Sequence, residues 1–156
     1  MHPKFADAVD SLHGSFEQLV AQLPICEARF TAPPPARGVY LFSEGARHLY
    51  VGRSNNIRSR YGGHCNAGSP RQKAAFAFKL AREMTGKLKA AYKAGDESQA
   101  GLMTDPTFVA AFMAAKERIR KMDFRCVEEA DPVKQCLLEV YCAVVLETRY
   151  NDFDNH

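Results

Sequence analysis

Apolar residues recur along the chain at two different spacings, and together these spacings predict an α+β protein. Over positions 5–23 they recur at steps of three and four residues, which indicates an amphipathic helix that Gly14 is expected to weaken or break. Two short runs rich in β-branched and aromatic residues, 39–43 and 47–51, flank Glu44-Gly45-Ala46 and predict a hairpin with a three-residue loop. Residues 124–127 predict a third strand.

The length of the hairpin loop determines which side chains of the two strands face each other. A three-residue loop pairs Ser43 with Arg47, which places Tyr40 opposite Tyr50 on one face of the sheet. A slip of one residue would put the two rings on opposite faces. We therefore expect the two tyrosines to be direct cross-strand neighbours.

Capping residues and helix breakers predict four further helices. Asn55 or Asn56 is expected to cap a short helix over 57–61 that ends at Gly62-Gly63. A long helix rich in Ala and Lys is expected over 71–94, with Gly86 as a point of interruption. An Asp-Pro pair at 105–106 and another at 131–132 are typical helix starts, and predict helices to about 121 and 147. The expected fold is a small three-stranded antiparallel sheet flanked by helices, with an N-terminal helix and inserted helices.

Composition places the chain among ordinary globular proteins. The 156 residues are 46% hydrophobic and 25% charged, and this length suits a single domain over residues 1–156. No apolar run approaches the roughly 20 residues that a membrane-spanning helix needs. The N-terminal residues do not resemble a signal peptide. We expect a cytoplasmic protein that does not insert into a membrane.

The five cysteines predict neither a disulfide framework nor a structural zinc site. Their number is odd and no two are spaced as in C-x-x-C, so we expect reduced and mostly buried thiols. Cys65 follows His64 directly, and a reactive Cys–His pair is the alternative. No second feature of the sequence supports a thiol nucleophile.

Basic residues are concentrated in one segment although the net charge is only +3. Residues 53–93 contain ten Lys and Arg residues against one acid, Glu83. Such a segment on a nearly neutral protein suits the binding of a polyanion on one face, and the alternative is a solvated helix face.

Three places in the sequence carry reactive side chains. Tyr40 and Tyr50 form a predicted cross-strand pair, for which packing alone is the alternative. Arg60 and His64, four residues apart, would share a helix face if the helix continued that far. Glu139 is flanked at helical spacing by small or weakly polar side chains, none of which can pair with it. A carboxylate in such surroundings needs a cation or a metal from elsewhere.

These residues stand at the spacings of a known family. Gly38-Val39-Tyr40, followed by Tyr50-Val51-Gly52 ten residues later, resembles the motif that names the GIY-YIG nucleases. Ten further residues lead from the second tyrosine to Arg60, as they do to the family's helical arginine. Glu139 precedes Asn151 by twelve, like the family's metal-binding glutamate and its asparagine. His64, four residues after Arg60, is similar to the arginine–histidine pair of the restriction-endonuclease branch.

The resemblance implies a metal-dependent endonuclease that hydrolyses DNA phosphodiester bonds with a tyrosine general base and a single Mg²⁺ or Mn²⁺. Tyr40 would accept a proton from the attacking water, with Tyr50 or His64 as a relay, and Arg60 would hold the phosphate. Glu139 would bind the metal, and Asn151 would orient the metal shell or a neighbouring side chain. The basic segment would supply the DNA contacts, through Arg53, Arg58, Arg71, Lys73 and Lys79.

The resemblance also divides the chain. Residues 37–156 would form a GIY-YIG-like nuclease core with a helical insertion at about 65–120, and residues 1–30 an N-terminal helical extension. Whether the substrate is single- or double-stranded DNA stays open. Whether the protein acts as a monomer or a homodimer stays open as well. One alternative is a catalytically inactive nucleic-acid-binding protein on the same fold, and another is an interaction domain in which the spacings are coincidental. A binding protein has no need of an isolated carboxylate that repels phosphate.

Overall fold

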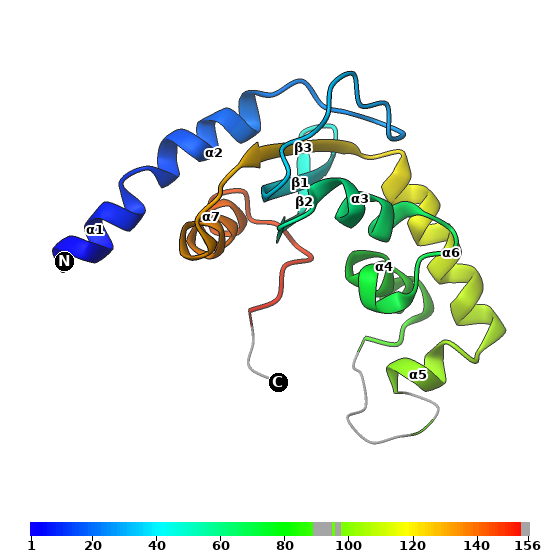
Figure 1. Ribbon diagram of the computed structural model, residues 1–156. Coiled ribbons are helices and arrows are strands. Elements are labelled where there is room, and N and C mark those ends of the chain that lie inside the picture. Colours follow the sequence, from blue (N-terminus) through cyan, green and yellow to red (C-terminus); the bar gives the residue numbers. More distant parts are fainter. Residues whose placement is uncertain (89–94, 96–97, 154–156) are drawn as a thin grey trace. The chain divides into compact units, whose positions relative to one another are not determined.

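The computed structural model of the protein describes residues 1–88, 95 and 98–153 (Figure 1). The chain forms two compact units, which we call the sheet unit and the helical unit. The sheet unit comprises Met1–Arg60 and Met122–His156, and the helical unit comprises Tyr61–Lys121. No helix within the described ranges is both long and apolar enough to cross a membrane.

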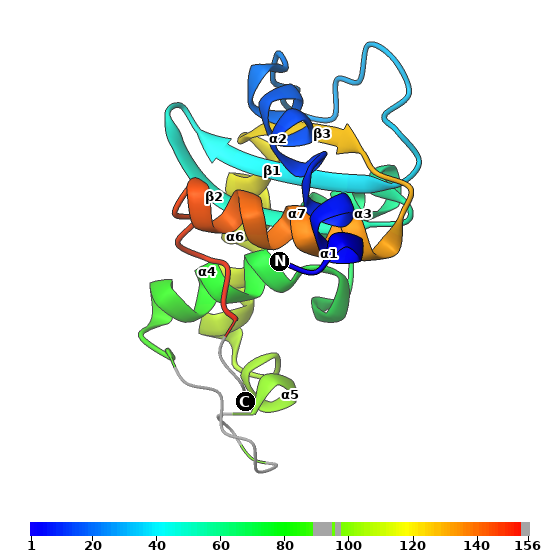
Figure 2. The ribbon, with the colours of Figure 1, turned by 90° about the vertical axis from the view of Figure 1, so that its left-hand side faces the viewer.

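The sheet unit contains the predicted three-stranded antiparallel sheet. Its strands are β1 (Gly38–Glu44), β2 (Arg47–Ser54) and β3 (Asp123–Glu128), and β1 lies between the other two (Figure 2). Helices pack against this sheet, so the expected α+β class is confirmed. The third strand extends one residue beyond the predicted run at each end.

One face of the sheet carries the hydrophobic core of this unit. Aliphatic side chains from all three strands meet buried residues of α2 (Leu12–Ala21) and α7 (Pro132–Val145). The buried members of this cluster are Leu12, Leu19, Val39, Leu41, Val51, Val127, Leu138 and Cys142. Because side chains alternate along a strand, the residues between these point to the other face, and there aromatic rings predominate.

The N-terminal helical segment is broken, but not where the sequence predicts. It forms α1 (Pro3–Val9) and α2, and the interruption falls at Asp10-Ser11, while Gly14 lies inside α2. Asp and Ser compete for backbone hydrogen bonds and disfavour helix interiors. Burial of Leu12 and Leu19 stabilises α2 and offsets the roughly 1 kcal/mol that a glycine costs in a helix.

The hairpin loop is shorter than predicted. Glu44 pairs with Arg47, so Gly45-Ala46 forms a two-residue loop in which Gly45 has a φ of 59°. Two-residue loops favour glycine because they require positive φ values that match the strand twist. The prediction of a three-residue loop was therefore wrong by one residue.

A β-bulge next to this loop changes the register once more. It lies between Phe42 and Ser43, and beyond it Tyr40 pairs with Gly52 while Phe42 pairs with Tyr50. The predicted direct pairing of Tyr40 with Tyr50 is thus wrong by two residues. Because two steps restore the alternation of side chains, both tyrosines still lie on the same face of the sheet.

Helix α3 (Ile57–Cys65) is longer than predicted, because Gly62 and Gly63 do not end it. Of the two candidate caps, Asn56 is the one used, and its Oδ1 accepts a hydrogen bond from the N–H of Ser59 at 3.0 Å. A side chain at position 63 would bring its Cβ within 2.8 Å of the carbonyl oxygen of Lys73. Gly63 therefore permits close packing of the backbone rather than a helix end.

The helical unit is built on α4 (Ala75–Thr85) and α6 (Pro106–Arg120), which pack against each other, with Phe78 contacting Phe108 at a ring-centroid distance of 5.0 Å. A 3₁₀ turn, Arg71–Lys73, precedes α4, and α5 (Gln99–Leu102) precedes α6. The single long helix predicted from residue 71 is thus a short turn and a helix that stops at Thr85, before Gly86. The end predicted at residue 94 lies outside the described residues.

Both Asp-Pro pairs start helices as predicted. The Asp105 carboxylate accepts a hydrogen bond from the N–H of Thr107 at the start of α6. The Asp131 carboxylate accepts two hydrogen bonds of 2.9 Å, from the N–H groups of Val133 and Lys134, at the start of α7. Helix α7 ends at Val145, two residues earlier than predicted, and it carries Glu139 in its third turn.

Candidate active site

The two tyrosines meet as diagonal neighbours on the aromatic face of the sheet. The ring centroids of Tyr40 and Tyr50 lie 6.4 Å apart, and a hydrogen bond joins the two phenols. Tyr40 also stacks on Phe124 at 5.8 Å, and it is only 2% exposed. The Tyr40 ring is therefore held between two strands, with its hydroxyl directed towards Tyr50.

Gly52 makes room for the Tyr40 ring. It is the cross-strand partner of Tyr40, and a Cβ placed on it would overlap the hydroxyl and Cζ atoms of that tyrosine. Any larger residue at position 52 must displace the phenol. The glycine that completes Tyr50-Val51-Gly52 thus has a steric role on the same face as the two hydroxyls.

Glu139 has a partner from another element, as its isolation within α7 predicted. Its Oε2 accepts a hydrogen bond of 2.9 Å from Nε of Arg53 on β2, and the two groups form an ion pair. The Glu139 side chain is 22% exposed and the Arg53 side chain is 45% exposed. In this structure Arg53 neutralises Glu139, and the contact with nucleic acid that was predicted for Arg53 stays a prediction.

Arg60 lines an open polar pocket beside this ion pair. The pocket has a volume of about 430 Å³ and lies within the sheet unit, where its lining residues are Arg53, Ser54, Asn55, Asn56, Arg60 and Gln135. Two of these six are arginines and none is acidic. Within the part of the chain that the structure describes, the Arg60 guanidinium makes no hydrogen bond or ion pair. The pocket therefore suits an anion that can accept hydrogen bonds.

The charges of these residues act on one another. Burial raises the pKa of Tyr40 well above its ordinary value, and Tyr50 and Glu139 add to this effect while Arg60 opposes it. Burial also raises the pKa of Tyr50, with a further contribution from Glu139 and opposition from Arg60. The pKa of Glu139 is raised by burial too, and Arg53 counteracts part of this rise. Tyr40, Tyr50, Arg60 and Glu139 thus form one electrostatically coupled group, in which both phenols are protonated at neutral pH.

Asn151 lies at the outer edge of β2, and its side chain is engaged with the backbone. Its Oδ1 accepts from the N–H of Val51 and its Nδ2 donates to the carbonyl of Val51, both at 2.8 Å. The hydroxyl of Thr148 donates to the same Oδ1 at 2.8 Å. The amide is therefore occupied in holding the C-terminal segment beside Tyr50. Both roles predicted for Asn151, orientation of the metal shell or of a neighbouring side chain, stay predictions.

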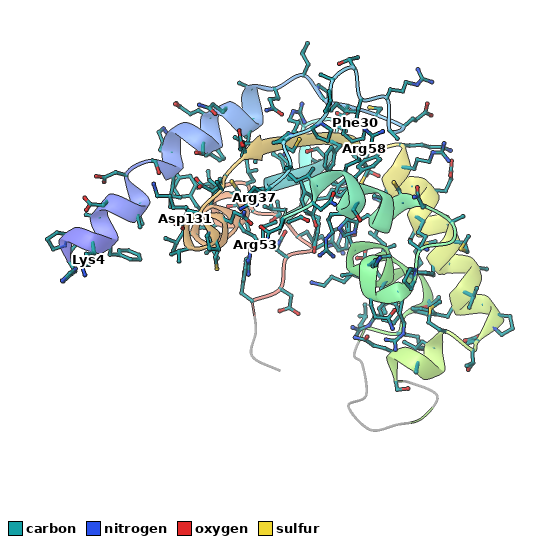
Figure 3. All side chains as sticks on the ribbon, in the orientation of Figure 1. Lys4, Phe30, Arg37, Arg53, Arg58 and Asp131 are labelled. Atoms are coloured by element: carbon teal, nitrogen blue, oxygen red, sulfur yellow. The ribbon has the colours of Figure 1, made fainter. Side chains whose placement is uncertain are left out.

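The predicted basic residues are divided between the two units. Arg58, on α3, lies over the ring of Phe30 with 6.0 Å between its Cζ and the ring centroid (Figure 3). Arg71, Lys73 and Lys79 belong to the helical unit, where Arg71 donates a hydrogen bond to Gln99. Lys89 and Lys93 of the same basic segment lie outside the described residues. The predicted contact of Arg58, Arg71, Lys73 and Lys79 with nucleic acid stays a prediction.

His64 also belongs to the helical unit, where it is buried. The continuous helix α3 does place it one turn after Arg60, as the predicted pair requires. The neighbouring Cys65 is buried as well, and this burial raises the pKa of its thiol. A neutral, buried thiol is a poor nucleophile, so the structure does not favour the Cys–His alternative.

All five cysteines are free thiols. Cys65, Cys126 and Cys142 are buried, Cys26 is half-buried and Cys136 is exposed. Three of the five thiols are thus buried, as predicted.

The residues around Glu139 favour some metals over others. Nowhere in the described ranges do three or more His, Cys, Asp or Glu side chains cluster so that they could hold a metal ion together. A single carboxylate does not fit zinc, which takes three or four protein ligands. It does fit Mg²⁺ or Mn²⁺, which bind through one or two carboxylates and complete their shell with water and substrate phosphate.

Four pocket residues were not predicted from the sequence as part of a site, namely Ser54, Asn55, Asn56 and Gln135. Asn55, Asn56 and Gln135 line the pocket, and Nε2 of Gln135 donates hydrogen bonds to Asn55 and to the carbonyl of Glu129. The signal was present in α7, since Gln135 stands four residues before Glu139. A polar residue one turn from an isolated carboxylate, on an otherwise apolar stretch, indicates a shared polar site.

The fold and the site together define the class of this protein. It is an α+β protein in which two tyrosines, two arginines and a carboxylate gather around the outer strand of a small sheet. No protein-family model, curated protein or solved structure matches the chain.

Proposed function

We propose that this chain is a GIY-YIG-type endonuclease that hydrolyses DNA phosphodiester bonds with the help of Mg²⁺ or Mn²⁺. The observation that carries the proposal is the placement of Tyr40 and Tyr50 side by side on the sheet, with Arg60 in a pocket that has no acidic lining and Glu139 paired with Arg53 of the same pocket. These residues come from β1, β2, α3 and α7, and local structure alone gives no reason for them to meet. We expect the enzyme to act in the cytoplasm.

Hydrolysis requires a base for the attacking water and a cation for the phosphate. The water oxygen attacks phosphorus, the bond to the leaving sugar oxygen breaks, and that oxygen takes up a proton. Arg60 is suited to hold the non-bridging oxygens, because its guanidinium lines the pocket without a competing partner. A divalent ion on Glu139 would supply positive charge at the phosphate and stabilise the leaving oxygen.

The phenol pair must lose one proton before it can accept another from water. Arg60 lowers the pKa of both phenols and so opposes the effect of burial. The hydrogen bond with Tyr40 lowers the pKa of Tyr50 and so favours its ionised form. A shared hydrogen bond lets the pair act as one titrating group, with Tyr40 next to the water and Tyr50 as the relay.

Cleavage is expected to become faster as the pH rises above neutrality. The raised tyrosine pKa values mean that the phenolate fraction is small at pH 7 and grows about tenfold for each pH unit. Single-turnover rates on a labelled duplex, measured from pH 6 to 9, should therefore rise steadily in the wild type. Tyr40→Phe should show no cleavage at any of these values. A flat profile would argue against a phenol as the base.

A metal-dependence assay separates the nuclease from a protein that only binds nucleic acid. Supercoiled plasmid and single-stranded DNA are incubated with the full chain in EDTA, Mg²⁺ or Mn²⁺, and the products are resolved on gels. We expect nicked products with either metal and none with EDTA. The absence of product with both metals would instead favour the inactive binding protein.

A further inference from the structure

The ion pair between Arg53 and Glu139 uses only part of each side chain. One contact joins them, the 2.9 Å hydrogen bond from Nε of Arg53 to Oε2 of Glu139. Within the described part of the chain, no other hydrogen bond or ion pair engages the Arg53 terminal nitrogens or the second carboxylate oxygen. Both groups are thus able to exchange partners without breaking anything else.

Arg53 faces the pocket as well as the carboxylate. It lines the pocket together with Arg60, so two guanidinium groups border a space whose lining includes no acid. Its side chain is 45% exposed, so that packing does not fix its end in one position. A guanidinium in this place can reach either the carboxylate or an anion in the pocket.

We propose that Arg53 and a divalent cation compete for Glu139, and that the displaced Arg53 guanidinium binds a phosphate of the nucleic acid in the pocket. This inference rests on the proposed function. Arg53 now supplies the positive charge that a half-buried carboxylate requires. A divalent ion at the same carboxylate would repel the guanidinium at close range, and a phosphate beside Arg60 would attract it.

The exchange makes Arg53 a positioning residue that couples two binding events. In the free protein it keeps the carboxylate neutralised and weakens metal binding. Once the carboxylate holds a metal, the same guanidinium becomes available to DNA. Because coupling between two ligands is reciprocal, metal should tighten DNA binding and DNA should tighten metal binding.

Mn²⁺ binding by the full chain, measured by calorimetry without DNA, tests the competition directly. Arg53→Gln should bind Mn²⁺ about 3- to 10-fold more tightly than the wild type, since it removes the competing cation. Arg53→Lys, which keeps the charge, should stay close to the wild type. Arg47→Gln is the matched control, an exposed arginine at the opposite end of the same strand, and should also leave the affinity unchanged.

DNA binding gives an independent readout. The anisotropy of a labelled oligonucleotide is measured at constant ionic strength in EDTA and in Ca²⁺, with Ca²⁺ as a probe ion in place of Mg²⁺. We expect Ca²⁺ to tighten binding by the wild type and by Arg47→Gln, and Arg53→Gln to lose this gain. Equal gains in the wild type and in Arg53→Gln would overturn the release of Arg53 to phosphate.

Variants at Glu139 and Arg53 distinguish a failure of the Arg53 exchange from a failure of the proposed metal site. If Glu139→Gln abolishes Mn²⁺ binding but Arg53→Gln binds no more tightly than the wild type, the exchange is wrong and the nuclease proposal stands. If the wild type and Glu139→Gln both fail to bind Mn²⁺, the proposed metal site is wrong and the exchange falls with it.

Discussion

Glu139→Gln is expected to reduce DNA cleavage about a thousandfold or more while leaving the fold intact. Removal of the only carboxylate of the coupled group removes the proposed metal ligand, and a loss of about 4 kcal/mol of transition-state stabilisation corresponds to this factor. Gel-based cleavage rates in Mg²⁺ provide the measurement. DNA affinity in EDTA should not fall, because the change removes a negative charge near phosphate.

Stability separates this result from a purely structural role for Glu139. Burial raises the pKa of Glu139 in the folded protein, so folding favours the protonated carboxyl. Its contribution to stability is therefore complete below the pKa of the unfolded chain and is lost as the pH rises through the pKa of the folded protein. At pH 7 the ionised carboxylate therefore costs stability, and glutamine removes that cost. We expect a free energy of unfolding within about 1 kcal/mol of the wild type in urea titrations, or higher.

Glu117→Gln is the matched control for this experiment. Glu117 is also a helical glutamate with a cationic partner, Lys121 at 3.6 Å, but it lies on α6 in the helical unit. The Glu117→Gln variant should cleave DNA at the wild-type rate. Wild-type cleavage by Glu139→Gln itself would remove Glu139 from the mechanism.

Gly52→Ala is expected to reduce both cleavage and stability, although it adds only one methyl group. The new Cβ overlaps the Tyr40 hydroxyl and Cζ, so the phenol must move within a tightly packed aromatic cluster. Overpacking of this kind costs about 1–3 kcal/mol of unfolding free energy. A displacement of about 1 Å at a reacting group can lower a rate by about a hundredfold.

The control for this change is Gly14→Ala in α2. No atom lies within 4 Å of the Cβ that it would add, so the substitution should raise the unfolding free energy by about 1 kcal/mol through helix propensity alone. Its cleavage rate should match that of the wild type. Normal cleavage by Gly52→Ala would show that the chemistry tolerates displacement of Tyr40.

Much of the fold could be predicted from local patterns. Alternating and helical spacings located all three strands and most helices, and the Asp-Pro pairs located the starts of α6 and α7. These features depend on neighbouring residues alone. The isolation of Glu139 was equally visible, because the absence of a helical partner is a local property, and it correctly predicted a partner from elsewhere.

The remaining features depend on contacts between distant segments, which local patterns do not determine. The hairpin register was wrong because two single-residue effects, a shorter loop and a bulge, combined. Gly62 and Gly63 indicate a helix end in the sequence. In the structure the Lys73 backbone lies so close to position 63 that only a glycine fits there. The pairing of Arg53 with Glu139 joins residues 86 positions apart, and only the fold brings them together.

The contacts of Asn151 have a consequence for how this protein behaves at high concentration. An outer strand exposes unpaired backbone groups to which a strand of another molecule can add. At Val51 the Asn151 amide satisfies both groups, and Tyr150 donates its N–H to the carbonyl of Leu49. The opposite edge is occupied as well, since Ile25 and Phe124 exchange two backbone hydrogen bonds of 2.8 Å. Loss of the C-terminal segment would therefore leave β2 open to edge-to-edge aggregation.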